Sequence, residues 1–217
     1  TSAARTVIDA IQSVVPLRRC TCRATRSPGT GPCVPAQLGL AACPCSGEVD
    51  EEQYARIVTR AVEGLTSRPD LLIDPLAVLM RELADQKRFE EAEEVRCRAA
   101  ALAGALRRQH RLGRLRESGR LQVLSPGRGG AEFCDGLLVQ AWRADAAGDP
   151  TLEFPPASGK RPVPGEPIPR DIADELNCVA AWLESESHVL RLEHCDGTLA
   201  DPLTRIPTFR PLTDPHA

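Results

Sequence analysis

The stretch Pro16–Gly47, which reads PLRRCTCRATRSPGTGPCVPAQLGLAACPCSG, decides how the rest of the chain is organised. It is rich in proline and glycine, and it holds five of the nine cysteines: Cys20, Cys22, Cys33, Cys43 and Cys45. A segment so short and so rich in turn residues cannot bury an apolar core of its own. We therefore expect a cross-link to hold it together.

Disulfides, zinc and an iron–sulfur cluster are the cross-links that clustered cysteines allow. The cysteine count is odd and no signal peptide precedes the cluster, which favours a reducing cytoplasm where such thiols more often bind metal. The close pairs are spaced Cys-x-Cys rather than the Cys-x2-Cys typical of zinc ribbons, and four thiolates suit either zinc or a cubane cluster. The residues alone leave the metal open. The other four cysteines are scattered singly: Cys97, Cys134, Cys178 and Cys195.

The same stretch resembles the cysteine-rich region of the UvrC family of DNA-repair nucleases. The family pattern has a cysteine after Pro-Leu-Arg-x, then Pro-Cys-x3-Gln-x-Gly and later Pro-Cys-x-Gly. The matching positions are Cys20, Pro32, Cys33, Gln37, Gly39, Pro44, Cys45 and Gly47. A further cysteine of the pattern would fall at residue 41, which is alanine here, so Cys43 or Cys22 is the candidate for the fourth ligand. The resemblance implies a [4Fe–4S] cluster, with zinc or no metal as the alternatives.

Residues 3–15 place apolar side chains on one stripe of a helix that ends before Pro16. In the UvrC family such a helix links the GIY-YIG nuclease domain to the cysteines. The chain has a single tyrosine, Tyr54, so the catalytic residues of that domain are not here and we expect no catalytic site in this chain. The resemblance implies a nuclease domain upstream, in a divergent protein of the type that fuses a DEDD exonuclease to a GIY-YIG domain.

Two helical segments are expected after the cysteines. Asp50 is a predicted N-cap for a helix that Ser67–Pro69 closes, and residues 74–110 predict a helical hairpin with Pro75 in its first turn and a break near residues 86–88. Phe89 opens the second helix opposite Met80. We therefore expect the Phe89 ring to be buried between the two helices.

The hairpin is similar to the UVR motif, which in UvrC docks on a like hairpin of UvrB. The matching residues are Met80, Phe89, Ala92 and Arg96, and the departures are Leu83, Glu93 and Cys97. The resemblance implies a UvrB-like partner bound through the four matching residues. The apolar face is too small for an isolated hairpin, so it packs either on such a partner or on the rest of this chain.

Charge is distributed unevenly along the chain. The net charge of −3 argues against a uniformly basic nucleic-acid binder, but residues 107–128 carry seven arginines and one glutamate, whereas residues 129–217 sum to −8. On a continuing helix, four arginines would lie on or beside one face and could hold a DNA backbone: Arg107, Arg108, Arg111 and Arg114. The alternative is a solvated helix end, because no aromatic residues alternate with the arginines.

From residue 121 the pattern changes to short strands. We expect a hairpin over residues 121–144, a strand near residues 151–154, a proline-rich linker over residues 155–169, a helix capped by Asp171, a second hairpin around residues 196–197 and a frayed tail from Thr208. The histidines His188 and His194 are interpreted as structural. Four carboxylates are interpreted as surface groups rather than metal ligands: Glu132, Asp135, Glu193 and Asp196.

The sequence therefore predicts an α+β chain in three parts: residues 1–49 with the cysteines, residues 50–118 with the helical hairpin, and residues 119–217 as a small α+β module. We expect the non-catalytic part of a cytoplasmic, UvrC-like nucleotide excision repair nuclease that binds a cluster, the DNA backbone and a UvrB-like protein. No apolar run is long enough for a membrane span. The alternatives are a zinc- or cluster-binding interaction module without DNA contact, and a nuclease that uses the C-terminal carboxylates.

Overall fold

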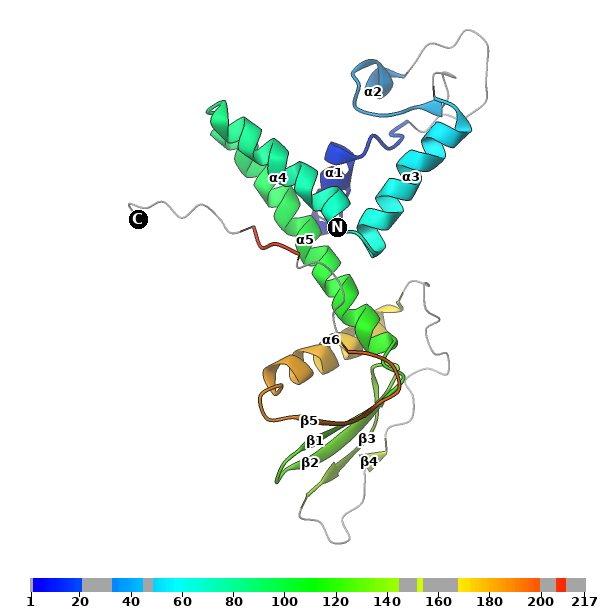
Figure 1. The fold of residues 1–217 in the computed structure, drawn as a ribbon, viewed down its shortest axis with the longest axis vertical. Helices are drawn as coiled ribbons and strands as arrows, with labels where there is room; N and C mark the ends of the chain where they lie inside the picture. Colours follow the sequence, from blue (N-terminus) through cyan, green and yellow to red (C-terminus); the bar gives the residue numbers. More distant parts are fainter. Residues whose placement is uncertain are drawn as a thin grey trace. The chain divides into compact units, whose positions relative to one another are not determined.

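A computed structural model describes residues 2–20, 33–44, 49–144, 152–153, 168–199 and 206–209 of the 217 (Figure 1). The chain forms two compact units. The N-terminal unit comprises Thr1–Arg107 together with Leu203–Ala217, and the C-terminal unit comprises Arg108–Pro202. Helices dominate the first and an antiparallel sheet the second, which confirms the α+β class. Cys22, Cys45 and most of the proline-rich linker lie outside the described residues.

The N-terminal unit is built from helices around one apolar core. They are α1 (Ser2–Val14), α2 (Val34–Gln37), α3 (Glu51–Thr66), α4 (Asp70–Asp85) and α5 (Phe89–Arg116), of which the residues up to Arg107 belong to this unit. No helix among the described residues is long and apolar enough to cross a membrane. The buried core residues are Ala10, Val15, Ala61, Leu72, Ile73, Leu76, Leu83, Ala92, Val95, Ala99, Leu102, Ala103 and Leu106.

Helix α3 begins at the predicted N-cap. The Asp50 carboxylate accepts a hydrogen bond from the backbone N–H of Gln53, and the Gln53 side chain accepts one from the backbone N–H of Asp50. This reciprocal pair satisfies two N–H groups that the first turn of a helix leaves without partners. Near the other end of α3, Gly64 is buried, and a Cβ at this position would lie 2.4 Å from a Leu72 side-chain carbon. Glycine therefore allows α3 and α4 to approach closely.

Helix α4 begins one turn earlier than predicted, at Asp70 instead of Asp74, so Pro75 lies inside the helix. The backbone N–H groups of Leu72 and Ile73 donate to the carbonyl of Pro69. Leu72 is fully buried and Ile73 is 1% exposed. Burial of these two side chains explains why the helix extends across a proline that cannot donate a hydrogen bond to the preceding turn.

The break between α4 and α5 falls at residues 86–88, as predicted. Lys87 has a φ of 60°, and the backbone N–H of Arg88 donates to the carbonyl of Leu83. Helices commonly end with a residue in the left-handed conformation, followed by a hydrogen bond back to a carbonyl five residues earlier. Glycine is the usual residue at the left-handed position. Helix α5 continues through the arginine-rich residues to Arg116.

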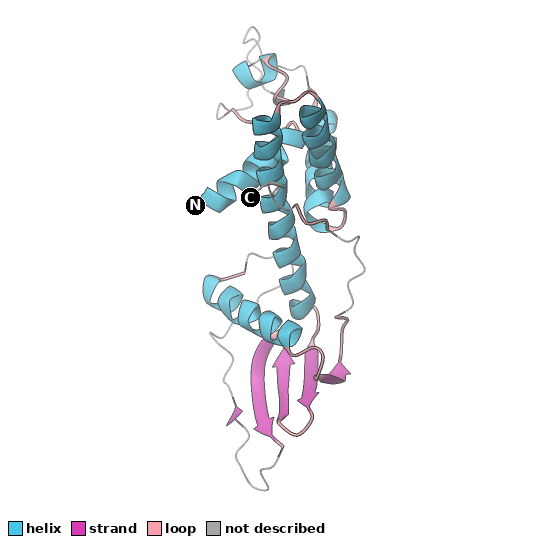
Figure 2. Ribbon diagram, turned by 90° about the vertical axis from the view of Figure 1, so that its left-hand side faces the viewer, coloured by secondary structure: helices cyan, strands magenta, loops and turns pink. Residues whose placement is uncertain are grey.

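The C-terminal unit is a sheet against which α6 (Arg170–Ser185) packs (Figure 2). Its strands are β1 (Arg120–Ser125), β2 (Gly129–Cys134), β3 (Leu137–Arg143), β4 (Leu152–Glu153) and β5 (Arg191–Cys195), in the antiparallel order β4-β3-β2-β1-β5. The residues of α5 from Arg108 onward pack against the same core. The buried residues are Leu112, Leu115, Leu121, Val123, Ala131, Phe133, Leu137, Ile172, Leu176, Val179 and Ala180.

Several details of the predicted module need correction. The second arm of the predicted hairpin is two strands, because Asp135 and Gly136 both have positive φ and form a two-residue turn between β2 and β3. The strand expected to form a second hairpin through a turn at residues 196–197 is β5. It pairs with β1 instead of with a following strand. The N-cap of α6 is Pro169 rather than Asp171. The tail is not frayed at Phe209, which packs against the core of the N-terminal unit.

Candidate metal centre

Three of the five clustered cysteines lie in the described residues and come from three short segments. Cys20 ends the extended stretch after α1, Cys33 is the N-cap of α2, and Cys43 follows the turn after α2. The backbone N–H of Ala42 donates to the carbonyl of Pro16 over 2.8 Å. This hydrogen bond ties the segment of Cys43 to the segment of Cys20.

The turn after α2 brings the chain back towards the other cysteines. Gly39 has a φ of 67°, and the backbone N–H groups of Gly39 and Leu40 donate to the carbonyls of Ala36 and Pro35 over 2.9 Å each. The left-handed conformation favours glycine, because a side chain would approach the following carbonyl too closely. The positive φ of the turn therefore explains why a glycine occupies position 39 between Cys33 and Cys43.

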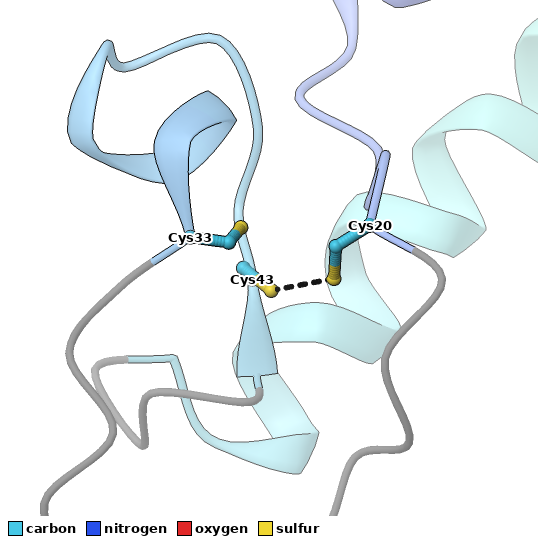
Figure 3. A group of neighbouring side chains, drawn as sticks. All are labelled: Cys20, Cys33 and Cys43. Atoms are coloured by element: carbon cyan, nitrogen blue, oxygen red, sulfur yellow. Dashed lines mark hydrogen bonds between the residues drawn. The ribbon is translucent and has the colours of Figure 1, made fainter.

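The three sulfur atoms converge. The Sγ atoms of Cys20, Cys33 and Cys43 all lie within 4.8 Å of one another, and those of Cys20 and Cys43 are 3.1 Å apart (Figure 3). Cys43 is 2% exposed, whereas the other two are half-buried. Cys33 is a free thiol, and Cys43 is disulfide-bonded. Cys43 must therefore be reduced before it can bind a metal as a thiolate.

A positively charged side chain lies beside the group of three cysteines. The Nε of Arg18 donates to the Sγ of Cys20 over 3.1 Å, and the backbone N–H of Arg18 donates to the hydroxyl oxygen of Tyr54 over 3.2 Å. A guanidinium beside a sulfur stabilises its negatively charged form, which is the form that binds metals. Neither residue was among the predicted site residues. Arg18 could have been found from its position two residues before Cys20, whereas Tyr54 is 34 residues away from Cys20 in the sequence.

The donor set fits a metal. Three convergent cysteine sulfurs, one of them buried, become soft ligands once Cys43 is reduced, and such ligands suit zinc, other soft metal ions and iron–sulfur clusters. Four sulfurs at about 2.3 Å from one tetrahedral ion lie about 3.8 Å from one another. In a cubane each thiolate binds a different iron atom, so its sulfurs lie farther apart. These three cysteines could hold a metal.

Among the predicted ligands, the structure therefore brings together Cys20, Cys33 and Cys43. The predicted ligands Cys45 and Cys22 lie outside the described residues. Ala41, which stands where the family pattern has a cysteine, is 6% exposed and belongs to the buried apolar residues. Of the two candidates for the missing ligand, Cys43 is the one that can be located, and its sulfur points into the group (Figure 3).

The four residues predicted to bind a partner lie on the hairpin of α4 and α5. Met80 packs against the core, Ala92 is buried, and Arg96 forms an ion pair with Glu93 over 2.6 Å. The expectation that Phe89 is a wedge between the helices is wrong, because its side chain is 63% exposed at the start of α5. Core contacts between the two helices come instead from buried residues farther along α5, such as Val95 and Leu102.

The four arginines predicted to bind DNA do lie on one continuous helix, but three of them contact their own chain. Arg107 donates to the carbonyl of Pro207, Arg111 to the side chains of Glu184 and Asn177, and Arg114 to the carbonyl of Leu199. The fourth, Arg108, is exposed. A DNA-binding role for these arginines stays a prediction.

Two of the four carboxylates considered in the C-terminal unit, Glu132 and Asp196, accept hydrogen bonds from neighbouring residues. Glu132 is not a surface group, because its side chain is 13% exposed and accepts hydrogen bonds from Arg120, Gln122 and Gln140. Arg120, followed by Gln122, holds the pKa of Glu132 below its ordinary value. A backbone hydrogen bond from Arg120 and a side-chain hydrogen bond from His194 likewise lower the pKa of Asp196. These contacts account for both groups without a metal.

Comparison with known proteins places the similarity in the N-terminal part. A family model described as UvrC/Cho excinuclease, middle domain, matches residues 1–64. The UvrABC system protein C of Caldanaerobacter subterraneus subsp. tengcongensis is 33% identical over 95 residues, which is 43% of this chain and 15% of that protein. The proteins of the same name from Rickettsia bellii and Rickettsia rickettsii are 35% and 36% identical over 98 residues, which is 45% of this chain and 15% of each of those proteins.

No solved structure matches this chain. The matched region spans only about a seventh of each relative. The family model places the similarity in the segment with the cysteines and the helices around it. The resemblance read from the cysteine pattern is confirmed there. Residues 1–64 therefore match the middle domain of UvrC/Cho excinuclease, and the chain is similar over fewer than half of its residues to UvrABC system protein C.

Proposed function

We propose that the N-terminal unit is the metal-binding and partner-docking segment of a UvrC-like nucleotide excision repair nuclease, and that this chain has no catalytic site of its own. The observation that carries the proposal is the convergence of Cys20, Cys33 and Cys43 within 4.8 Å, inside the residues that match the UvrC middle domain. When bound, the metal cross-links three segments that have little apolar core of their own. Its role is therefore structural.

The residues around the cysteines support a thiolate centre. Arg18 supplies a positive charge beside Cys20, and the hydrogen bond from Ala42 to Pro16 holds two of the ligand segments together. Cys45 or Cys22 would complete a set of four. The resemblance to the UvrC family favours a [4Fe–4S] cluster, and a single zinc ion is the alternative that the same thiolates allow.

Metal analysis of the protein, purified without oxygen and in the presence of a reductant, tests the proposal. We expect either about four iron atoms with matching acid-labile sulfide, or one zinc ion, per chain. Serine substitution at Cys20, Cys33 or Cys43 should remove the metal, whereas Cys178→Ser, at an exposed thiol in the C-terminal unit, should leave it in place. Protein without metal under these conditions would overturn the proposal.

Contact with the DNA backbone and with a UvrB-like protein belongs to the same proposal. Exposed Arg108 supports the first, and exposed Phe89 at the start of α5 supports the second. Backbone binding should weaken steeply with salt and show little sequence preference. We expect Arg108→Glu to weaken DNA binding, with Arg81→Glu, at an exposed arginine of α4, as the matched charge reversal that leaves it unchanged.

A second candidate function is a metal-binding interaction module that does not touch DNA. The observation in its favour is that Arg107, Arg111 and Arg114 bind acceptors of this chain. The two candidates differ in one measurement, since the module should show no salt-dependent affinity for a DNA duplex at low ionic strength.

A further inference from the structure

The segment Ile206–Phe209 lies along α5 in the N-terminal unit (Figure 1, red). Ile206 and Phe209 are half-buried and pack against the core of this unit, whereas Pro207 and Thr208 between them are exposed. Apolar residues at both ends therefore face the helices while the middle faces solvent. The segment has the pattern of a short extended ligand rather than of a free tail.

Two arginines of α5 hold the backbone of this segment. The Nη1 of Arg107 donates to the carbonyl of Pro207 over 2.9 Å, and the Nη1 of Arg96 donates to the carbonyl of Phe209 over 3.2 Å. Because Pro207 lies at Arg107 and Phe209 at Arg96, the segment runs antiparallel to α5. Arg96 is well positioned for this contact, because its side chain is only 12% exposed and is anchored by Glu93.

The helix surface between these arginines allows a backbone to approach. Steps of four, three and four residues lead from Arg96 through Ala100 and Ala103 to Arg107, so these residues share one face of α5. The two alanines between the arginines have small side chains, and Ala103 is fully buried. Small residues between two long donors form a shallow surface on which an extended chain can lie, with its carbonyls towards the guanidinium groups.

We propose that this face of α5 is a docking surface for an extended peptide, and that Ile206–Phe209 is an intramolecular strap that keeps it closed. The fitting ligand has an apolar residue, two solvent-facing residues and then an aromatic residue, and it presents backbone carbonyls to Arg96 and Arg107. A segment of a partner protein with this chemistry binds only when it displaces the strap. Arg96 is also a proposed partner-docking residue, so the idea that the strap controls that partner rests on the proposed function.

A peptide supplied in trans tests the strap. The probe is a fluorescent peptide with the sequence of residues 203–212, and its binding to the full-length protein is followed by fluorescence anisotropy. The double variant Ile206→Asp/Phe209→Asp removes both apolar anchors, and Thr208→Asp adds the same charge at the exposed position between them. If the strap is closed nine-tenths of the time in the unchanged protein, opening it should raise the apparent affinity about tenfold.

The expected result is tight binding to the double variant and weak binding both to the unchanged protein and to Thr208→Asp. Phe209→Ala, a milder change, should give an intermediate affinity, which keeps the test valid if the double variant folds poorly. Arg96→Gln, added to the double variant, should weaken peptide binding again. The proposal would be overturned if the unchanged protein, Thr208→Asp, Phe209→Ala and the double variant all bound the peptide with equal affinity. It would also be overturned if none of them bound it. No partner protein is used, so this outcome is independent of the proposed function.

Discussion

The backbone N–H of Ala42 donates to the carbonyl oxygen of Pro16 over 2.8 Å, and this hydrogen bond joins the segments that carry Cys43 and Cys20. The residues between them include the α2 turn, in which Gly39 has a positive φ. The site is therefore held by backbone geometry as well as by its thiols. Its ligand arrangement should respond to changes in the turn that leave every cysteine in place.

We predict that Gly39→Ala weakens metal binding. No atom lies within 4 Å of the added Cβ, so the cost of about 1–2 kcal/mol comes from the left-handed backbone alone. Gly113→Ala is the matched control, because Gly113 lies in α5 with open space around it and the same change there should stabilise the helix by about 0.5–1 kcal/mol. Competition with a chromogenic chelator measures the affinity. Equal affinities for the two variants would contradict this account of the turn.

Close packing of α3 on α4 predicts that Gly64→Ala destabilises the N-terminal unit. The new methyl group would lie 2.4 Å from the Cγ of Leu72, which is fully buried and cannot move aside freely. Overpacking of this kind costs about 1–3 kcal/mol. Chemical denaturation followed by circular dichroism measures the change. Addition of Leu72→Ala should relieve the clash, so the double variant should lose less stability than the sum of the losses of the two single variants. A loss equal to that sum would contradict the proposed clash.

Phe89→Ala should change the free energy of unfolding by less than about 0.5 kcal/mol, because the ring is 63% exposed. Leu102→Ala, at a fully buried position of the same helix, should cost about 2–5 kcal/mol. Both values come from urea denaturation. A large loss of stability for Phe89→Ala would restore the view that this ring holds the hairpin together.

The network around Glu132 predicts a dependence of stability on pH. Because Arg120 lowers the pKa of Glu132 in the folded protein, its contribution is present above the ordinary glutamate pKa of about 4.3 and is lost as the pH falls through the lower, folded value. Stability should therefore decrease below about pH 4.3. Glu132→Gln should remove part of this decrease, whereas Glu117→Gln, for which no such network exists among the described residues, should not. Denaturant midpoints measured between about pH 3 and pH 6 check this prediction.

Much of the fold could be predicted from local patterns. Asp50 followed by Gln53 predicts the start of α3, and the apolar spacing predicts α1, α5 and α6, because these signals lie within a few residues of one another. The start of α4 could not be predicted, since it depends on the burial of Leu72 and Ile73 by other helices. The dipeptide Asp135–Gly136 is typical of a two-residue hairpin turn. The prediction placed it inside one longer strand and so did not identify the turn.

The candidate site divides in the same way. The cysteine pattern identifies Cys20, Cys33 and Cys43 because the ligand types and their clustering are visible in the sequence. It cannot identify Tyr54, nor the contact of Phe209 with Arg96, because these pairs are brought together only by tertiary packing. The exposure of Phe89 was missed for the same reason. The spacing of apolar residues predicts which face of a helix a residue lies on. It does not predict whether a neighbouring helix extends far enough to cover that residue.

X-ray absorption at the metal edge of the reduced protein tests the central claim, that Cys20, Cys33 and Cys43 bind one metal centre, most directly. We predict a first shell of about four sulfur atoms near 2.3 Å, with a short iron–iron distance in addition if the centre is a cluster. Cys43→Ser should lose a sulfur ligand or the metal, and Cys178→Ser should give the spectrum of the unchanged protein. A first shell of oxygen and nitrogen only, or a spectrum that Cys43→Ser leaves unchanged, would contradict the account.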